Sequence, residues 1–460
     1  MNSNWPIVKI EDIKAKSKNA ITIGPFGSRM KSDCYVEFGV AVIRGTNLGA
    51  GPKFIKDFAY ITDAKADELA TCNVYKNDLV FPHRGSIGEV GIINDNQRYV
   101  LSSSLMKLTC DNEKAHPKFI YYFFKSSLGK HELLKNSSQV GTPGIGQPLT
   151  SLKSIELPLP PIKIQEQIAV ILGALDDKIQ LNSQINRTLE QIAQATFKSW
   201  FVDFEPVKAK IAALESGGSE DDALLAAMQA ISGKAPEDLT RLQTELPEQY
   251  AELRATAELF PSAMQESELG EIPEGWRPVQ VEHFIELSYG KALKKTVRID
   301  GPYPVYGSGG ITGSHNEPLV SGPGIIVGRK GTVGSIYWES KDFYPIDTAY
   351  YVSPKNGGSL SFSYYLLQTL GLKEMNTDAA VPGLNRNNVY RLEIPFYPVP
   401  IIERFTQIAD SISRKVSASN AESELLTEFR DSLLPKLLSG ELSITDAEGQ
   451  LAEAEESANV

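Results

Sequence analysis

Two long stretches of this 460-residue chain carry the same apolar spacing, and together they divide up the rest of the sequence. In residues 164–204 and 402–438, large apolar side chains recur in steps of three and four, which places them along one face of a helix. A helix of roughly 40 residues is about 60 Å long, because each residue adds about 1.5 Å. Pro160, Pro161, Pro398 and Pro400 precede these stretches or open them, and proline is tolerated near the start of a helix.

The same spacing is typical of a coiled-coil seam, so we expect the two helices to pack against each other. Asn182 and Ser419 interrupt the apolar stripes, and we interpret them as residues that fix the register of the pair. Two unrelated amphipathic helices buried in a core would show the same spacing, so the choice depends on what precedes each helix. The predicted seam residues are Ile168, Ile171, Leu175, Ile185 and Leu189 in the first helix, and Ile408, Ile412, Leu426 and Leu433 in the second.

The segments that precede the two helices repeat each other. LVFPHRGSIGEVGII at 79–93 corresponds to IIVGRKGTVGSIYWE at 325–339, and both read as two strands joined by a glycine-rich turn. The aromatic run FIYYFFKS at 119–126 corresponds to FSYYLLQT at 362–369, and Pro143-Gly144 corresponds to Pro382-Gly383. These features recur in the same order at offsets of 239–246 residues, which indicates a duplication.

The predicted fold class is therefore α+β: two pseudo-repeated mixed α/β domains, at 1–160 and 275–400, separated by two long antiparallel coiled-coil helices at 161–206 and 401–440. The first helix carries the chain from one domain to the other, so a second helix that pairs with it has to run back. The domains are then expected at opposite ends of the pair, related by an approximate twofold axis. An acidic helical insertion at 207–274 and a tail at 441–460, predicted to be disordered, complete the chain.

Charge is unevenly distributed. The net charge is −11, but residues 205–274 hold 15 acidic and 5 basic residues, and residues 441–460 hold 6 acidic and no basic ones. The two α/β domains are mildly basic, which permits DNA binding without demonstrating it. Three cysteines without CxxC spacing and the lack of an apolar run of roughly 18 residues predict a soluble cytoplasmic protein that makes no membrane contact.

Taken together, a set of motifs resembles the specificity subunit of type I restriction–modification systems over nearly the whole chain. The matching segments are GPFGS at 24–28, VIRGTNL at 42–48, PLPPIKIQEQIAVILGALDDKI at 158–179, FKSWFVDFEPV at 197–207, ELGEIPEGW at 268–276, VYGSGGITGSHN at 305–316, GRKGTVG at 328–334, PIDTAYYV at 345–352 and FRDSLLPKLLSGEL at 429–442.

The resemblance implies a non-catalytic chain that serves as the DNA specificity subunit of a larger complex. Each α/β domain would be a target-recognition domain that reads one half of a bipartite, asymmetric site in double-stranded DNA. The helices would set the spacer and dock two methyltransferase (modification) subunits, and motor–nuclease (restriction) subunits would join outside. No cofactor is expected in this chain: S-adenosylmethionine would belong to the methyltransferase partner, and ATP and Mg to the motor–nuclease partner.

The residues themselves also argue against chemistry in this chain. No GxxxxGK[ST] phosphate loop and no Asn/Asp-Pro-Pro-Tyr segment is present, and the five histidines lack metal-ligand spacing. The glycine cluster at 307–313 lacks the strand–helix frame of a dinucleotide site. Asp176-Asp177-Lys178 matches part of a nuclease pattern, but on a coiled coil we interpret it as a solvated charged face.

Candidate DNA contacts lie in loops where cations adjoin tight turns or where amide side chains gather. Arginine pairs bidentately with guanine and asparagine with adenine, and glycine turns approach phosphate closely. Ordinary hairpins with exposed charges and solvated loops are the alternative for these residues. The candidates are Arg29, Lys31, Arg44, Arg84, Ser86, Gln139 and Gln147 in the first domain, and Lys291, Lys294, Lys295, Arg298, Arg329, Lys330, Thr332, Asn385, Arg386, Asn387 and Asn388 in the second.

Two other functions remain open from the sequence. A self-contained enzyme acting on nucleic acid is disfavoured by the missing phosphate, cofactor and metal motifs. A protein-binding scaffold without direct DNA readout is favoured by the acidic balance of the chain.

Overall fold

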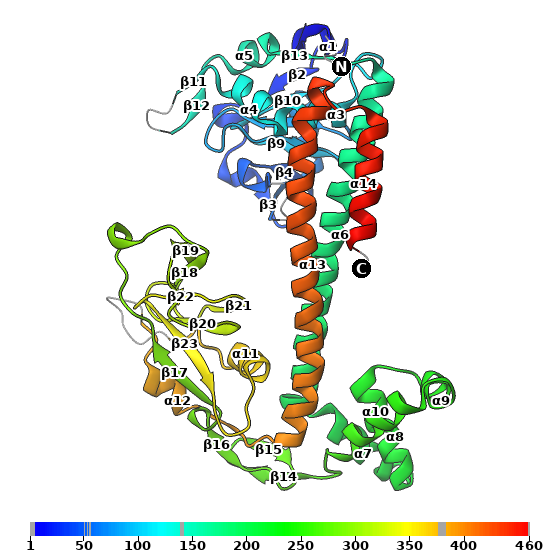
Figure 1. Ribbon diagram of the computed structural model, residues 1–460, viewed down its shortest axis with the longest axis vertical. Helices are drawn as coiled ribbons and strands as arrows, with labels where there is room; N and C mark the ends of the chain where they lie inside the picture. The colour runs from blue at the N-terminus through cyan, green and yellow to red at the C-terminus, as the bar shows by residue number, and fades with distance from the viewer. Residues whose placement is uncertain are drawn as a thin grey trace. The chain divides into compact units, whose positions relative to one another are not determined.

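The computed structural model describes residues 5–49, 51–52, 54, 57–138, 142–375 and 383–458. The chain divides into two compact units (Figure 1). Unit 1 comprises Met1–Gln184 and Ser419–Val460, and unit 2 comprises Ile185–Ala418. The long helices α6 (Ile162–Phe201) and α13 (Val399–Ser439) contribute residues to both units, so each unit is described with its own part of them.

Unit 1 is built on a four-stranded antiparallel sheet in the order β2-β10-β7-β8. These strands are β2 (Ile21–Ile23), β10 (Leu105–Leu108), β7 (Leu79–Pro82) and β8 (Gly91–Ile92). A second sheet has the order β3-β5-β4-β9-β6, formed by β3 (Tyr35–Val36), β5 (Ala59–Ile61), β4 (Val40–Ile43), β9 (Tyr99–Leu101) and β6 (Asn73–Val74). β1 (Ile7–Lys9) pairs with β13 (Glu156–Pro158), just before α6.

Unit 2 repeats the four-stranded sheet as β17-β23-β20-β21, again antiparallel throughout. These strands are β17 (Ile285–Tyr289), β23 (Ala349–Pro354), β20 (Gly324–Gly328) and β21 (Ile336–Glu339). β16 (Pro278–Gln280) pairs with β24 (Glu393–Pro395), as β1 pairs with β13. The units differ in the second sheet that accompanies the four-stranded one. In unit 2 this sheet has three strands in the order β19-β18-β22: β19 (Gly310–His315), β18 (Tyr303–Gly307) and β22 (Tyr344–Pro345). The shared topology confirms the predicted duplication.

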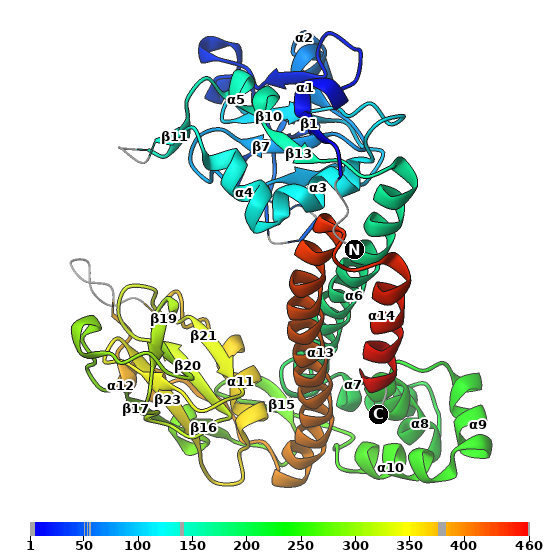
Figure 2. The ribbon, with the colours of Figure 1, turned by 45° about the horizontal axis from the view of Figure 1, so that its top comes forward.

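The repeated aromatic runs are helices: α3 (Pro117–Lys125) in unit 1 and α11 (Leu360–Thr369) in unit 2. Phe119, Phe123 and Phe124 on α3 are fully buried, and the Phe124 ring meets that of Phe81 from the sheet with centroids 4.9 Å apart. On α11, Phe362 is fully buried and contacts Phe197 of α6 with centroids 5.7 Å apart. Each aromatic helix therefore fills the space between its sheet and the long helices (Figure 2).

The two long helices run antiparallel in both units. In unit 1, Asn182 of α6 donates to Glu422 Oε2 of α13 at 2.7 Å, and Asp176 pairs with Arg430 at 2.6 Å. In unit 2, the Phe197 ring lies 5.3 Å from that of Phe405, between centroids. Residues further along α6 thus contact residues earlier in α13. This order confirms the predicted antiparallel pairing.

The seam differs in part from the prediction. Ile168, Ile171, Leu175 and Leu433 are buried, but Ile185 is 44 % exposed and Ile408 is 37 % exposed. Asn182, only 4 % exposed, occupies the seam position near Ile185. Asn182 was predicted in the same stripe as a register residue, and it donates to Glu422 and Ser423 of α13; apolarity alone therefore did not decide which side chains of the stripe are buried.

The interpretation of Asp176 as part of a solvated face is also wrong. Asp177 and Lys178 are exposed, but Asp176 is buried and is held by two partners. Tyr122 Oη donates to Asp176 Oδ2 at 2.8 Å, and Arg430 Nη1 donates to Asp176 Oδ1 at 2.6 Å. Burial, and then the negative charge of Asp176, raise the pKa of the Tyr122 phenol above its ordinary value.

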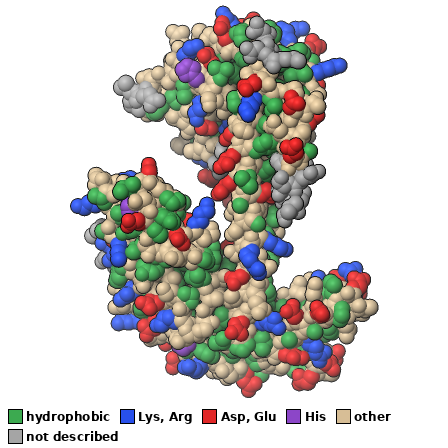
Figure 3. Space-filling view, in the orientation of Figure 1, with side chains coloured by type: hydrophobic (Ala, Val, Ile, Leu, Met, Phe, Trp, Pro, Cys, Tyr) green, Lys and Arg blue, Asp and Glu red, His purple; other side chains and the backbone are tan. Residues whose placement is uncertain are grey.

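The insertion forms four helices and a hairpin. Helices α7 (Glu205–Glu215), α8 (Glu220–Ser232), α9 (Pro236–Glu245) and α10 (Pro247–Glu258) are followed by strands β14 (Met264–Ser267) and β15 (Gly270–Pro273). A small core of their own, with Leu224, Met228 and Leu239, joins helices α8–α10. Acidic side chains are prominent on their visible face (Figure 3).

The tail, predicted to be disordered, contains a helix instead. Helix α14 (Ile444–Ala458) runs alongside α6 in unit 1 (Figures 1 and 2). Ala447 is fully buried in the core of unit 1, and Leu442, Ile444 and Leu451 pack against that core. The prediction followed the acidic composition and overlooked the apolar residues at helical spacing. Burial of these residues stabilises the helix.

Candidate nucleic-acid interface

Two of the predicted loops lie against each other in unit 1. Arg84, at the start of the glycine turn after β7, forms an isolated β-bridge with Gly144 of the Pro-Gly loop. Gly85 N donates to Pro143 O at 2.8 Å, and Ile145 N donates to His83 O at 2.9 Å. We call this arrangement the first loop pair. It brings one cationic turn and one loop from far along the chain to a single edge of the domain.

Unit 2 contains the corresponding second loop pair. Lys330, at the glycine turn after β20, bridges Gly383, and Leu384 N donates to Arg329 O at 2.8 Å. Lys330 is the sequence counterpart of Arg84, and Gly383 is the counterpart of Gly144. The duplication therefore preserves a loop contact that local sequence could not show.

Backbone geometry explains the glycines of these turns. Gly85 and Gly331 have φ angles of +83° and +86°, which side chains with a Cβ rarely adopt. At Gly334 a Cβ would lie 2.4 Å from the backbone of Leu372. The amides of Ile87 and Val333 already donate to Gly85 O and Gly331 O within the turns, so they are unavailable to phosphate.

In unit 1, Arg84, Ser86 and Gln147 are exposed near the first loop pair, and the Arg44–Gly45 segment approaches Ser86. Arg44 donates to Asp57 O at 2.6 Å, whereas Arg29 makes a longer bond to Glu68 O at 3.4 Å. Lys31 is exposed. Gln139, a predicted base-reading residue, lies outside the described residues.

In unit 2, the predicted lysines Lys291, Lys294, Lys295 and Lys330 are all exposed. Thr332, two residues after Lys330, is exposed as well. Arg298 is occupied within the domain: its Nη1 donates to Thr312 O at 2.8 Å and its Nη2 to Leu293 O at 3.3 Å. Its position supports a structural role in holding this loop.

The polar run at 385–388 opens a short helix, α12 (Arg386–Tyr390). Asn385 is its N-cap, and its side-chain oxygen accepts from Asn387 N at 2.9 Å. Asn387 is exposed and Asn388 is half-buried. Asn385 is also exposed, but its side-chain oxygen is used in the cap, so Asn387 is the better candidate for a DNA contact.

Sequence reasoning missed an aromatic residue at the second loop pair. Tyr289, at the end of β17, lies under two guanidinium groups: the Cζ of Arg329 is 4.9 Å from the ring centroid, and that of Arg386 is 5.1 Å. Such distances are those of cation–π contacts. The surface of the second domain thus includes this cluster as well as the exposed lysines.

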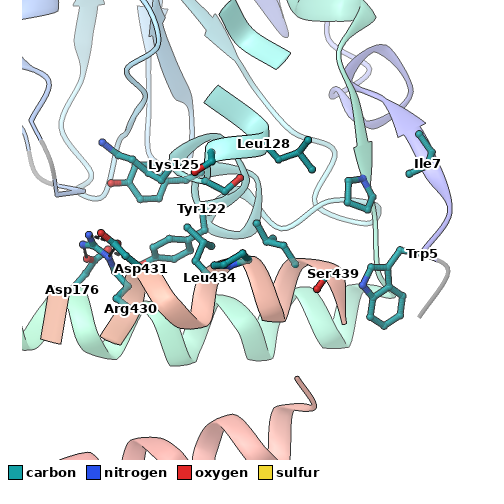
Figure 4. A pocket seen from close by; sticks show the side chains of 16 residues that line it. Trp5, Ile7, Tyr122, Lys125, Leu128, Asp176, Arg430, Asp431, Leu434 and Ser439 are labelled. Atoms are coloured by element: carbon teal, nitrogen blue, oxygen red, sulfur yellow. Dashed lines mark hydrogen bonds and ion pairs between the residues drawn. The ribbon is translucent and has the colours of Figure 1, made fainter. Parts of the chain in front are cut away.

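A cavity of about 700 Å³ lies in unit 1 between helices α3 and α4 (Ser127–Leu134) and the long helices (Figure 4). Arg430 and Leu434 of α13 line it from one side and Tyr122 and Leu128 from the other. Ile7 is 62 % exposed and Leu128 is 52 % exposed at this cavity. The buried Trp5 Nε1 there lacks a hydrogen-bond acceptor among the described residues.

Two absences apply to the described part of the chain. No group of histidine, cysteine, aspartate and glutamate side chains there has the geometry to hold a metal ion. Nor does any helix in the described ranges combine the length and hydropathy that crossing a membrane requires.

The fold and the loop pairs define a duplicated protein. Each unit carries a loop pair of the same construction, but the side chains around the two loop pairs differ. A family model described as type I restriction modification DNA specificity domain matches residues 2–191 and 273–427. The chain belongs to this family and is a non-catalytic specificity subunit of a type I restriction–modification complex.

Individual relatives agree. The type I restriction enzyme HindI specificity subunit of Haemophilus influenzae is 34 % identical over 385 residues, covering 76 % of this chain and 82 % of the relative. The MjaIX specificity subunit of Methanocaldococcus jannaschii is 24 % identical over 413 residues, covering 86 % of each chain. The crystal structure of an S subunit from M. genitalium superposes with a TM-score of 0.51 at 19 % identity, over 95 % of this chain and 97 % of that one, and supports the fold.

Proposed function

We propose that this specificity subunit reads a split DNA sequence, with each α/β domain recognising one half. The observation that carries the proposal is the repeated loop pair, Arg84 with Gly144 and Lys330 with Gly383. The two pairs have the same construction but different neighbouring side chains. Two such sites on one chain would read an asymmetric sequence.

The helices would set the unread gap between the two halves. Both α6 and α13 are continuous, at 40 and 41 residues, and they pair with each other in each unit. A paired helix resists bending more than a loop of the same length, so it suits a fixed spacing. The half-sites of duplex DNA face the same side when they are about 34–36 Å apart or at multiples of that distance.

The chemistry would belong to partner subunits. Two adenine methyltransferase subunits, using S-adenosylmethionine, would dock on the helices and flip the target base out of the duplex. Motor–nuclease subunits, using ATP and Mg, would join them. The cavity between α3–α4 and the long helices in unit 1 would offer one docking surface, because the exposed apolar side chains of Ile7 and Leu128 line it.

Methylation mapping tests this proposal. The chain is co-expressed with its methyltransferase subunit in a host that lacks other adenine methylation, and methylated adenines are mapped genome-wide. We expect one split sequence, and we expect no methylation when this chain is omitted. Replacing residues 1–160 with the first domain of another specificity subunit should change one half only. A change in both halves would contradict independent readers.

A protein-binding scaffold without direct DNA readout is the second candidate, and the acidic helices α7–α10 favour it. A gel shift with the methyltransferase complex on target and random duplexes, at several salt concentrations, separates the two. Salt-dependent binding with preference for the target supports DNA readout, and equal binding to both duplexes supports the scaffold.

A further inference from the structure

We propose that Arg329 and Arg386, held on Tyr289, are the guanine-reading centre of the second domain. The inference rests on the proposed DNA readout and assigns part of it to specific side chains. Its physical basis is that two guanidinium groups converge on one half-exposed ring at the second loop pair.

The three residues come from different elements. Tyr289 ends β17, Arg329 follows β20, and Arg386 is the first residue of α12. Tyr289 remains 47 % exposed although both guanidinium groups lie about 5 Å from its ring centroid, at 4.9 and 5.1 Å. The cluster therefore lies at the surface while the sheet and α12 fix its position.

Each guanidinium is held by one backbone carbonyl and a second ring. Arg329 Nη1 donates to Asp347 O at 3.0 Å, and its Cζ is 5.9 Å from the Tyr350 centroid. Arg386 Nη1 donates to Leu287 O at 3.3 Å, and its Cζ is 5.7 Å from the Tyr390 centroid. These contacts restrict the orientation of two otherwise flexible side chains.

The rings are anchored in turn. Tyr350 Oη donates to Leu384 O at 3.0 Å, next to the bridge between Lys330 and Gly383. Tyr390 Oη accepts from Leu287 N at 2.8 Å. The cluster and the second loop pair are thus parts of one hydrogen-bonded assembly.

The positive charge of the cluster is not neutralised within the described residues, where no carboxylate lies within 4.0 Å of either guanidinium. Two other cations of this chain that are largely buried do have acidic partners: Lys107 pairs with Asp78 at 3.4 Å and Arg430 with Asp176 at 2.6 Å. Two like charges close together are unfavourable unless another group compensates them.

The Nε of Arg386 is buried, as are those of Arg44, Arg98 and Arg298, so it does not distinguish the cluster. A ligand that reaches the cluster from solvent would therefore meet the terminal nitrogens of the guanidinium groups. Guanine presents two acceptors, O6 and N7, side by side in the major groove, and the planar guanidinium matches them. A phosphate contact needs charge but not this fixed planar orientation, so we favour base readout.

The test is binding-site selection from a random duplex pool with the purified full-length chain. Wild type should select a split sequence with guanine in the half that belongs to the second domain. Domain replacement at 1–160 identifies that half. Arg329→Lys and Arg386→Lys keep the charge but lose the planar fork, and each should reduce the preference for guanine at one position by about 5- to 100-fold.

Tyr289 acts as a positioning residue. Tyr289→Phe keeps the ring and should retain the preference for guanine, whereas Tyr289→Leu should lose it. The matched control is Lys294→Ala, an exposed cation of the same domain outside the cluster. This control should weaken binding to all duplexes equally and lower the salt dependence, with base preference unchanged. Thermal unfolding by circular dichroism checks that every variant is folded.

Three outcomes overturn the inference. If the folded lysine variants weaken binding to all sequences equally, the arginines contact phosphate and do not read a base. If wild type shows no guanine in the second half, or if Tyr289→Leu leaves the preference unaltered, the cluster is not the reading centre. If wild type selects no split sequence at all, the proposed function itself fails.

Discussion

At the residue scale, the duplication kept two tyrosines and changed their partners. Tyr122 on α3 and Tyr365 on α11 occupy matching positions, and each donates to a carboxylate of α6. Asp176, the partner of Tyr122, is neutralised by Arg430 at 2.6 Å. Glu190, the partner of Tyr365, has no cation within 4.0 Å in the described part of the chain. The tyrosine of the first domain therefore binds a carboxylate that has a cationic partner, whereas the tyrosine of the second domain binds one that has none among the described residues.

Asp176→Asn should destabilise unit 1, because it leaves Arg430 without its principal counter-charge in a largely buried site. Removing one partner of a buried ion pair costs about 3–5 kcal/mol in the free energy of unfolding, measurable by urea denaturation. The exposed neighbour provides a control: Asp177→Asn should change that free energy by less than about 0.5 kcal/mol. Similar values for both variants would show that the pair contributes little.

Glu190 gives a prediction about pH. Burial raises the pKa of its carboxyl above the ordinary value of 4.5, although hydrogen bonds from Tyr365 and Gln194 oppose this. The folded state thus holds this proton more tightly than the unfolded state, so the free energy of unfolding falls as pH rises from about 4.5 through the raised pKa. Glu190→Gln should remove this part of the fall above pH 4.5. An unchanged pH profile in urea titrations would contradict the prediction.

At the element scale, the sequence predicted the long helices, the hairpin turns and the duplication, because these depend on periodicity and on glycine. It placed Asn182 and Ile185 in one stripe of α6, but it could not predict that Asn182 would be buried and Ile185 44 % exposed. It predicted the turn at Arg84 and the loop at Gly144 separately, but their contact depends on the whole domain. Tyr289 was missed because its partners, Arg329 and Arg386, lie 40 and 97 residues further along the chain.

The helix pair gives a prediction about spacing. Deleting seven residues from each helix, 179–185 and 416–422, keeps the seam in phase and removes about 10.5 Å of helix. If the helices set the gap, the methylated sequence should shorten by about 3 base pairs, given about 3.4 Å per pair. Methylation mapping measures the gap. Deleting five residues from each helix, which turns the seam by about 140°, serves as the control and should abolish methylation. A wild-type gap in the seven-residue deletion would exclude the ruler role.

At the scale of the whole molecule, the net charge of −11 conceals two kinds of surface. The insertion and the tail carry the excess of acidic over basic residues, while the loop pairs carry Arg84, Arg329 and Lys330. A negatively charged insertion is repelled by the phosphate backbone, so it should not form part of the DNA contact. The net charge alone therefore does not indicate whether this chain binds DNA.

Partner binding can be tested at the cavity of unit 1. Leu128→Glu and Ile7→Glu place a charge on exposed positions, so folding should be retained, but docking of an apolar partner surface should weaken. We expect at least tenfold less methyltransferase subunit to co-purify, with unchanged thermal unfolding of the free chain. Val170→Glu, at an exposed position on α6 that does not line this cavity, is the control and should have no effect. Full recovery of the partner with both variants would place its docking surface elsewhere.

The last helix has a practical consequence for anyone who prepares this protein. Because the final twenty residues are rich in glutamate, they look like a disordered tail that could be removed before crystallisation. Ala447 and its apolar neighbours complete the core of unit 1. The truncation would therefore expose apolar surface, and the shortened protein should aggregate during storage.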